Sequence, residues 1–364
     1  MKQHVYMVRD WYGKYERPIS SVSLILGFVF DAVVLKRVDM FWENFWVIGH
    51  IVIVALCMIL IHKIKSIAGD EADPMKVHFW LVNITQFFFG GLLSVFLVFY
   101  FRSSDLSVSW LFILILGLAF WANESLKRQF VRMTFQVSLL FLSVFLASIF
   151  QVPIIIHQIG REAFIFSGLI SLLVMSVFLF ILEKVSKETF TKSKKSIFFS
   201  IAAIFIGMNI LYFTNIIPPI PLSLKDYGIY HSIEKNDNGD YVVSFENIGW
   251  RAYFKISDDI HIIPGETVYA YSAIFSPTSL NIPIVHEWQY YDNVRNSWVS
   301  LSSVTLPLIG GREGGFRTYS GRSVLQAGKW RVNVLTQSGQ VIGRLRFNVL
   351  ISNTSPVLQT KMLI

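Results

Sequence analysis

The sequence contains a single cysteine and few charged residues. Cys57 lies inside an apolar run, and there is no cysteine beyond residue 214. That part of the chain therefore has to fold without disulfides, even in an oxidising compartment. Only 15% of the 364 residues are charged, whereas 53% are hydrophobic. Soluble domains contain about 25% charged residues. This composition is typical of a protein that crosses a membrane several times.

Motifs for the common enzymatic chemistries are also missing. The sequence has no G-x-S-x-G nucleophile, no catalytic Cys–His pattern and no nucleotide-binding fingerprint. Its eight histidines lack the paired spacing of metal ligands. The glycine-rich stretch 310–315 lacks the Lys-Ser/Thr of a phosphate-binding loop. We therefore expect a non-enzymatic protein without a cofactor or a metal ion.

The net charge of +8 has a topological explanation. Residues 1–214 hold 19 Lys/Arg against 13 Asp/Glu, and residues 215–364 hold 13 against 11. The surplus lies mainly in short loops between apolar runs, where it reports membrane orientation. We expect no nucleic-acid partner.

Seven apolar runs are long enough to cross the hydrocarbon core as helices. They are 19–35, 44–61, 80–101, 106–122, 133–151, 164–182 and 196–214. Pro153 is predicted to end the fifth helix. The last run is followed by three prolines within 215–221, which remove amide donors and predict a stiff, extended elbow.

The loops predict the orientation and the domain order. An inside N-terminus leaves 15 Lys/Arg in the inside segments and four in the outside loops. We therefore predict a multi-pass inner-membrane protein whose C-terminal domain is periplasmic or extracellular. The predicted parts are a cytoplasmic segment 1–18, a transmembrane helical domain 19–214, the elbow 215–221, a β domain 222–350 and a C-terminal tail 351–364.

After the elbow the pattern changes to short segments rich in Val, Ile, Tyr, Trp and Thr. Strands are predicted over 267–275, 284–291 and 297–306, and a hairpin joins 329–335 to 340–349. Trp330, Val332 and Val334 alternate to one face of this hairpin, as do Val341, Leu345, Phe347 and Val349. This region predicts an all-β, immunoglobulin-like sandwich.

Several short motifs in this region carry a family resemblance. They are His286-Glu287-Trp288, Phe316-Arg317-Thr318-Tyr319-Ser320, Gly328-Lys329-Trp330-Arg331-Val332, Gly339 and Phe347-Asn348-Val349. Together, over about 268–349, they resemble a bacterial domain family of unknown function found at the C-terminus of membrane and envelope proteins. Phe316 departs from the pattern, in which tryptophan is expected. The resemblance implies a compact β domain and supplies no reaction or ligand.

One candidate site lies in the predicted membrane domain. Asp31, His50 and Asn209 fall at a similar depth near the outer ends of three helices. Ionisable groups at that depth are costly unless they are paired or face water. Asp31 as proton acceptor and His50 as titrating partner would form a proton- or ion-handling site. The alternative is a hydrogen-bonded pair that locks two helices together.

A second candidate is a basic face of the β domain. Five arginines are its members: Arg317, Arg322, Arg331, Arg344 and Arg346. On a shared face they would bind anionic lipid headgroups or an acidic envelope polysaccharide through charge-assisted hydrogen bonds. Alternatively, they form a solvated sheet face whose aliphatic stems cover apolar surface.

A third candidate is aromatic. His286, Trp288 and Tyr290 share one face of one strand, where exposed rings would stack on sugars. A tryptophan stripe at period two is more often the core of a sandwich.

These observations favour a non-enzymatic membrane protein that presents a β-sandwich to an envelope component or a protein partner. The alternative is a small-solute or ion transporter that uses the Asp31–His50 layer. An intramembrane lipid enzyme is less favoured, because it would need a denser polar cluster. Besides the lipid bilayer, the partners that fit are an envelope polysaccharide, an anionic lipid or a protein; no oligomeric state is predicted.

Overall fold

The computed structural model describes residues 22, 25–35, 40–68, 79–125, 129, 132–237, 240–246, 258–277, 282–309 and 314–363. These residues form two compact units, a helical part and a β domain. The predicted N-terminal segment 1–18 lies outside the described residues.

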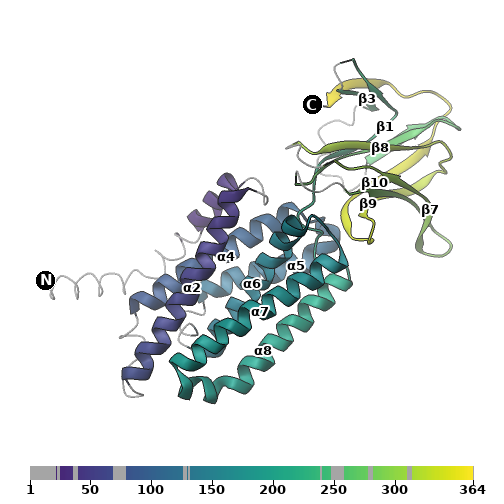
Figure 1. Ribbon diagram of the computed structural model, residues 1–364. Helices are drawn as coiled ribbons and strands as arrows, with labels where there is room; N and C mark the ends of the chain where they lie inside the picture. Colours follow the sequence, from purple (N-terminus) through teal and green to yellow (C-terminus); the bar gives the residue numbers. More distant parts are fainter. Residues whose placement is uncertain are drawn as a thin grey trace. The chain divides into compact units, whose positions relative to one another are not determined.

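The described chain contains six helices that are long and apolar enough to span a membrane (Figure 1). They are α2 (Phe41–Ala68), α4 (Phe79–Arg102), α5 (Leu106–Ser125), α6 (Met133–Ile156), α7 (Arg161–Val185) and α8 (Lys187–Phe213). A shorter apolar helix, Ile25–Val34, occupies the described portion of the first predicted run. The chain is therefore a multi-pass membrane protein, and the predicted helical bundle is confirmed.

Helix α6 is the most enclosed of these helices. In its most apolar window 67% of the residues are buried, against 22% in α5 and in α8. It packs against α2, α4, α7 and α8. The sequence predicts that Pro153 ends this helix, but α6 continues to Ile156. It stops where His157 adopts a φ of 55° and donates its N–H to the Pro153 carbonyl.

Ser186 alone separates α7 from α8. The sequence predicts that the last helix begins at Ser196, whereas α8 begins at Lys187. Of the lysines predicted to lie in this loop, Lys184 is in the last turn of α7, and the others are on the first turns of α8: Lys187, Lys192, Lys194 and Lys195.

The proline elbow differs from its prediction. Helix α8 ends at Phe213 as expected, but the segment that follows is not extended. The N–H groups of Ile220 and Leu222 donate to the carbonyls of Pro218 and Pro219, at 2.9 and 3.0 Å. Prolines fix φ near −65°, which suits turns as well as it suits an extended path.

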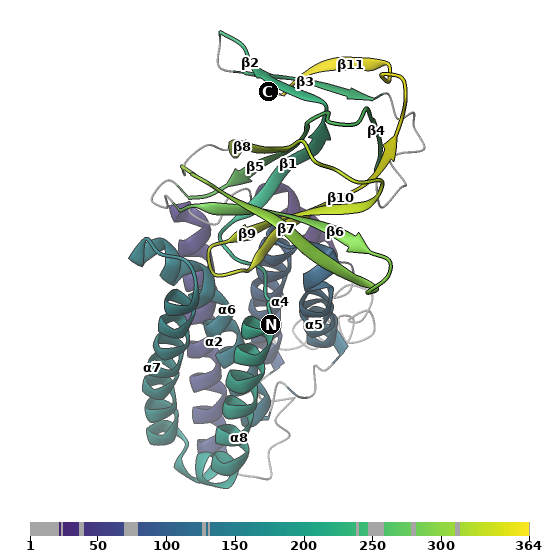
Figure 2. The same cartoon turned by 90° about the vertical axis from the view of Figure 1, so that its right-hand side faces the viewer.

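The β domain consists of eleven strands among the described residues, arranged in three sheets. The strands are β1 (Ser223–Tyr230), β2 (Ser232–Lys235), β3 (Tyr241–Glu246), β4 (Asp258–Ile262), β5 (Val268–Phe275), β6 (Ile284–Asp292), β7 (Ser297–Leu306), β8 (Phe316–Arg322), β9 (Gly328–Thr336), β10 (Val341–Ile351) and β11 (Leu358–Leu363). Their orders are β1-β5-β8, β4-β10-β9-β6-β7 and β11-β3-β2. Figure 2 shows the strands of the five-stranded sheet side by side.

The first two sheets form the predicted immunoglobulin-like sandwich. Strand β4 pairs in parallel with β10 at the edge of the five-stranded sheet, whereas the other pairings are antiparallel. The two inner faces bury Trp288 on β6, Trp330 on β9 and Phe347 on β10. A buried tryptophan on the strand equivalent to β6 is a hallmark of immunoglobulin domains.

A third layer covers the sandwich on one side. Tyr271 and Ala273 on β5 pack with Val243 on β3 and Leu363 on β11 in a second buried cluster. Strand β5 is therefore buried on both faces. The predicted tail 351–364 is corrected by this layer, because β11 pairs with β3 from Leu358 to Leu363.

The predicted hairpin is present as β9 and β10, with one local difference. Trp330, Val332 and Val334 face the core as predicted. The register shifts between Val341 and Gly343, so Ile342 is buried in place of Val341. A bulge adds one residue to a strand and reverses the alternation beyond it, which period-two counting does not anticipate.

Candidate functional site

Three arginines lie next to one another on the outer face of the five-stranded sheet. Arg331 on β9 is the cross-strand partner of Arg346 on β10, and Arg344 is opposite Asn333. The residues between them along both strands are buried in the core. Like charges directly opposite each other destabilise a sheet. We call Arg331, Arg344 and Arg346 the arginine face.

Arg344 is fixed by a chain of side-chain hydrogen bonds. Its Nε donates to Asn333 Oδ1 at 2.7 Å, and Asn333 Nδ2 donates to Glu287 Oε2 on β6 at 2.9 Å. Burial opposes the ionisation of Glu287, but hydrogen bonds from Asn333 and its neighbours outweigh burial and lower its pKa. Glu287 is therefore an anion that orients Asn333 toward Arg344.

Arg331 is held between an amide and an aromatic ring. Its Nε donates to Gln289 Oε1 at 2.6 Å, and its guanidinium carbon lies 4.3 Å from the centre of the Trp298 ring. Burial, together with the charges of Arg344 and Arg346, lowers its pKa from 12.5 to about 10. Arg331 thus stays charged at neutral pH. The Glu287 carboxylate opposes the effect of the two neighbouring arginines in part, and a further anion would offset more of their repulsion.

The other two arginines predicted for this face lie elsewhere. Arg317 on β8 is 8% exposed and pairs with Asp240 at 3.1 Å, under the third layer. Arg322 donates to Ser302 Oγ on β7 at 2.8 Å and to the carbonyl of Val324. The prediction of one five-arginine face is therefore corrected, because β8 belongs to the opposite sheet.

The predicted aromatic contact site is also corrected. His286 and Trp288 are fully buried between the two sheets, and Tyr290 is half-buried with its hydroxyl donating to the Ala327 carbonyl at 3.2 Å. His286 lies within hydrogen-bonding distance of Ser272 on β5 and Ser320 on β8, at 2.8 and 3.0 Å. His286 and Trp288 belong to a core that links the sheets, so their rings are closed to a sugar. Tyr290 is half-buried, but without the other two rings it does not form the predicted contact face.

A polar cluster that the sequence does not predict ties the third layer to the sandwich. His231, 2% exposed at its side chain, has Nδ1 2.7 Å from Glu266 Oε1 and Nε2 3.0 Å from Glu246 Oε1. Glu246 also contacts His261 Nδ1 at 2.7 Å. These residues are spread over 35 positions without a motif, so no local signal could have found them.

In the helical part, Asp31 and His50 each contact α4. Ser94 Oγ donates to Asp31 Oδ2 at 2.5 Å, and His50 contacts Gly91 closely enough that a Cβ there would lie 3.0 Å from Nε2. His50 Nδ1 is 2.8 Å from the carbonyl of Trp46 on its own helix. Gly91 and Ser94 are about one helical turn apart, so both predicted residues meet the same stretch of α4.

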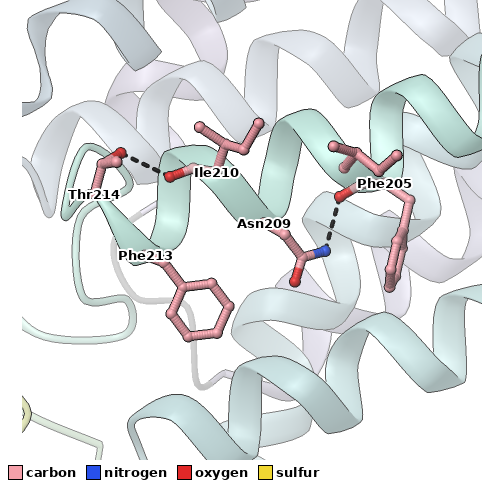
Figure 3. Close-up of a pocket in the computed structure, with 6 residues that line it drawn as sticks. Phe205, Asn209, Ile210, Phe213 and Thr214 are labelled. Atoms are coloured by element: carbon pink, nitrogen blue, oxygen red, sulfur yellow. Dashed lines mark hydrogen bonds between the residues drawn. The ribbon is translucent and has the colours of Figure 1, made fainter.

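Asn209 has a different partner, a backbone carbonyl of its own helix (Figure 3). Its Nδ2 donates to the Phe205 carbonyl, four residues earlier on α8, at 2.7 Å. The cavity beside it, of about 390 Å³, is lined by Phe205, Ile206, Asn209, Ile210, Phe213 and Thr214. All of these belong to the end of α8, so this cavity includes neither Asp31 nor His50.

The fold and the site define the class of protein: a multi-pass membrane protein with a β-sandwich domain that carries the arginine face. The family model described as "Protein of unknown function (DUF2914)" matches residues 282–349, which contain the whole arginine face. No curated protein matches the sequence significantly. One solved structure, the alkylpurine DNA glycosylase AlkC of Pseudomonas fluorescens bound to DNA containing an abasic site analog, is 10% identical. Its alignment covers 84% of this chain and 98% of that chain, with a TM-score of 0.23.

Proposed function

We propose that this protein is a non-enzymatic inner-membrane protein whose β domain binds an acidic envelope polysaccharide through the arginine face. One observation carries the proposal: Arg331 and Arg346 are directly opposite each other in the sheet. Such a pair costs stability; Glu287 offsets part of this cost at Arg331, and a bound anion would offset more. Guanidinium groups recognise carboxylate in a fork geometry, often with two hydrogen bonds.

The surroundings of Arg331 favour a sugar chain among anionic ligands. Trp298 lies under the guanidinium, and Tyr291 packs edge-on against Trp298 with ring centres 5.2 Å apart. Rings and cations side by side provide both stacking area for sugar rings and charge for their carboxylates. The loop charges of the sequence support an outward β domain, where such a polymer is accessible.

The test is a titration of the full-length protein in neutral nanodiscs with an oligogalacturonate and with a neutral dextran of equal length. We expect the acidic oligosaccharide to bind, with an affinity that falls as salt is added. The triple variant Arg331→Gln/Arg344→Gln/Arg346→Gln should bind at least about 10-fold more weakly.

A matched triple variant removes the same charge elsewhere on the domain. Lys225, Arg295 and Lys361 are exposed and lie off the arginine face, so their replacement by Gln should leave the affinity within about two-fold. Equal weakening of the two variants, or equal binding of dextran, would contradict the proposal.

A further inference from the structure

A cavity with basic lining residues lies in the helical part. Its volume is about 650 Å³, and it is lined by Lys65, Gln129, Arg132, Met133, Thr134, Phe135, Ser138, Thr189, Ser193 and Ser196. The lining comes from the last turns of α2, the start of α6 with the residues just before it, and the first turns of α8. These three helices pack against one another. The cavity therefore lies at one end of the bundle.

The chemistry of the lining is that of a phosphate site. Lys65 and Arg132 supply two cations, and Thr134, Ser193 and Ser196 supply hydroxyl donors. Neither cation forms an ion pair with another residue in the described part of the chain. The nearby carboxylate of Glu188 is held by Lys192 at 2.7 Å, away from the lining. Two cations and several hydroxyls match the oxygens of a phosphate group.

Apolar residues share the wall with these polar groups. Met133 is buried and Phe135 is half-buried at the same cavity. Deeper along α6, the hydroxyls of Ser138 and Ser200 lie 2.8 Å apart and tie α6 to α8. A cavity that combines cations, hydroxyls and apolar side chains at the ends of membrane-spanning helices fits a ligand with a phosphate head and an apolar tail. Basic pockets of this kind between transmembrane helices bind lipid headgroups.

We infer that this cavity binds the phosphodiester headgroup of an anionic membrane phospholipid, with Lys65 and Arg132 contacting the phosphate. Its ligand is distinct from the polysaccharide proposed for the arginine face. The two binding proposals are therefore tested by separate variants and separate ligands. The same end of the bundle carries Lys63 and Lys194, which do not line the cavity. These two residues offer a control of equal charge on α2 and α8, two of the three helices whose residues line the cavity.

The experiment uses native mass spectrometry of the delipidated full-length protein. Phosphatidylglycerol, phosphatidylcholine and soluble glycerol phosphate are titrated separately, and each variant is first checked for an unchanged thermal unfolding midpoint. We expect one phosphatidylglycerol to bind at least about 10-fold more tightly than phosphatidylcholine. Lys65→Gln/Arg132→Gln should weaken this binding about 10- to 30-fold. Lys63→Gln/Lys194→Gln should weaken it less than about three-fold.

Three results would overturn the inference. The first is unchanged phosphatidylglycerol binding by Lys65→Gln/Arg132→Gln. The second is equal weakening in both double variants, which would mean diffuse attraction by the basic end of the bundle. The third is competition by glycerol phosphate at concentrations similar to those of the lipid, which would assign the cavity to a soluble phosphate compound. If a double variant fails to fold, the single changes Arg132→Gln and Lys194→Gln repeat the comparison.

Discussion

The indole Nε1 of Trp288 donates a hydrogen bond to Ser320 Oγ at 3.0 Å, from one sheet of the sandwich to the other. The same hydroxyl lies 3.0 Å from His286 Nδ1. A polar link thus crosses a core that contains no disulfide, since the one cysteine, Cys57, is in α2. Buried polar groups are tolerated in such a place because each has a partner.

Replacing Trp288 with Phe should test this link. The change removes the indole donor and leaves a void between the sheets. We therefore expect the free energy of the opening reaction that permits hydrogen exchange to fall by about 2 kcal/mol. Trp298→Phe on the half-buried outer face should cost less than about 1 kcal/mol. Hydrogen exchange of peptides from β6 and β9 in the full-length protein measures both. Equal effects would contradict the assignment of Trp288 to the inter-sheet core.

Acidification should destabilise the β domain through His286. Burial lowers its pKa from 6.5 to about 4. Between about pH 6.5 and pH 4, His286 is protonated in the unfolded chain but neutral in the folded domain. The free energy of unfolding therefore falls as the pH falls from about 6.5 toward 4. Between pH 7.5 and pH 5 the loss should be about 2 kcal/mol.

The measurement is the pH dependence of hydrogen exchange at β5 and β6, with intrinsic exchange rates corrected at each pH. His286→Gln keeps hydrogen-bonding groups but does not titrate, so its stability should change less over the same pH range. An identical pH slope in this variant would assign the effect to groups other than His286.

Gly315 should be intolerant of a side chain. Its φ is 88°, and an added Cβ would lie 2.9 Å from the backbone of Ala273 and Ile274. Gly265 has almost the same φ, 89°, but its Cβ would meet no atom within 4 Å. We expect Gly265→Ala to cost about 1–2 kcal/mol from the left-handed backbone alone. Gly315→Ala should cost a further ~1–3 kcal/mol from overpacking against β5. Thermal unfolding of both variants compares them.

Cysteine labelling should establish the orientation of the membrane domain. Val294, 93% exposed in the β6–β7 turn, and Lys194 on α8 are each changed to Cys after Cys57→Ala removes the native thiol. The charge asymmetry of the loops leads us to expect labelling of position 294 by an impermeant maleimide in intact cells. Position 194 should react only after permeabilisation. The reverse result would invert the topology and remove access of the β domain to an outer polysaccharide.

Hydropathy and period-two alternation predict much of this architecture. The membrane helices follow from uninterrupted apolar runs, and β7 has the bounds expected from its β-branched and aromatic residues. Alternation correctly put His286 and Trp288 on one face of β6, but it cannot say whether that face is inner or outer. That choice depends on Ser272 and Ser320, which come from strands far apart in the sequence.

The parts that the sequence did not predict depend on contacts over long separations. β2, β3 and β11 are too short or too exposed to show a clear period, so the third layer was unforeseen. Without that layer, Arg317 counted as a surface cation instead of the partner of Asp240. To predict the arginine face, one has to know the register of β9 against β10. To predict the cavity at Lys65 and Arg132, one has to know how three helices pack.

The domain similarity and the folding unit have different boundaries. Residues 282–349 contain β6 to β9 and nearly all of β10, but β1, β4 and β5 precede them. A polypeptide cut to those limits would keep β8 but lose β1 and β5 of the opposing sheet, so Trp330 and Phe347 would be largely uncovered and we expect it to aggregate in water. Soluble expression of this domain should therefore begin before Ser223 and continue past Leu363, so that all three layers are included.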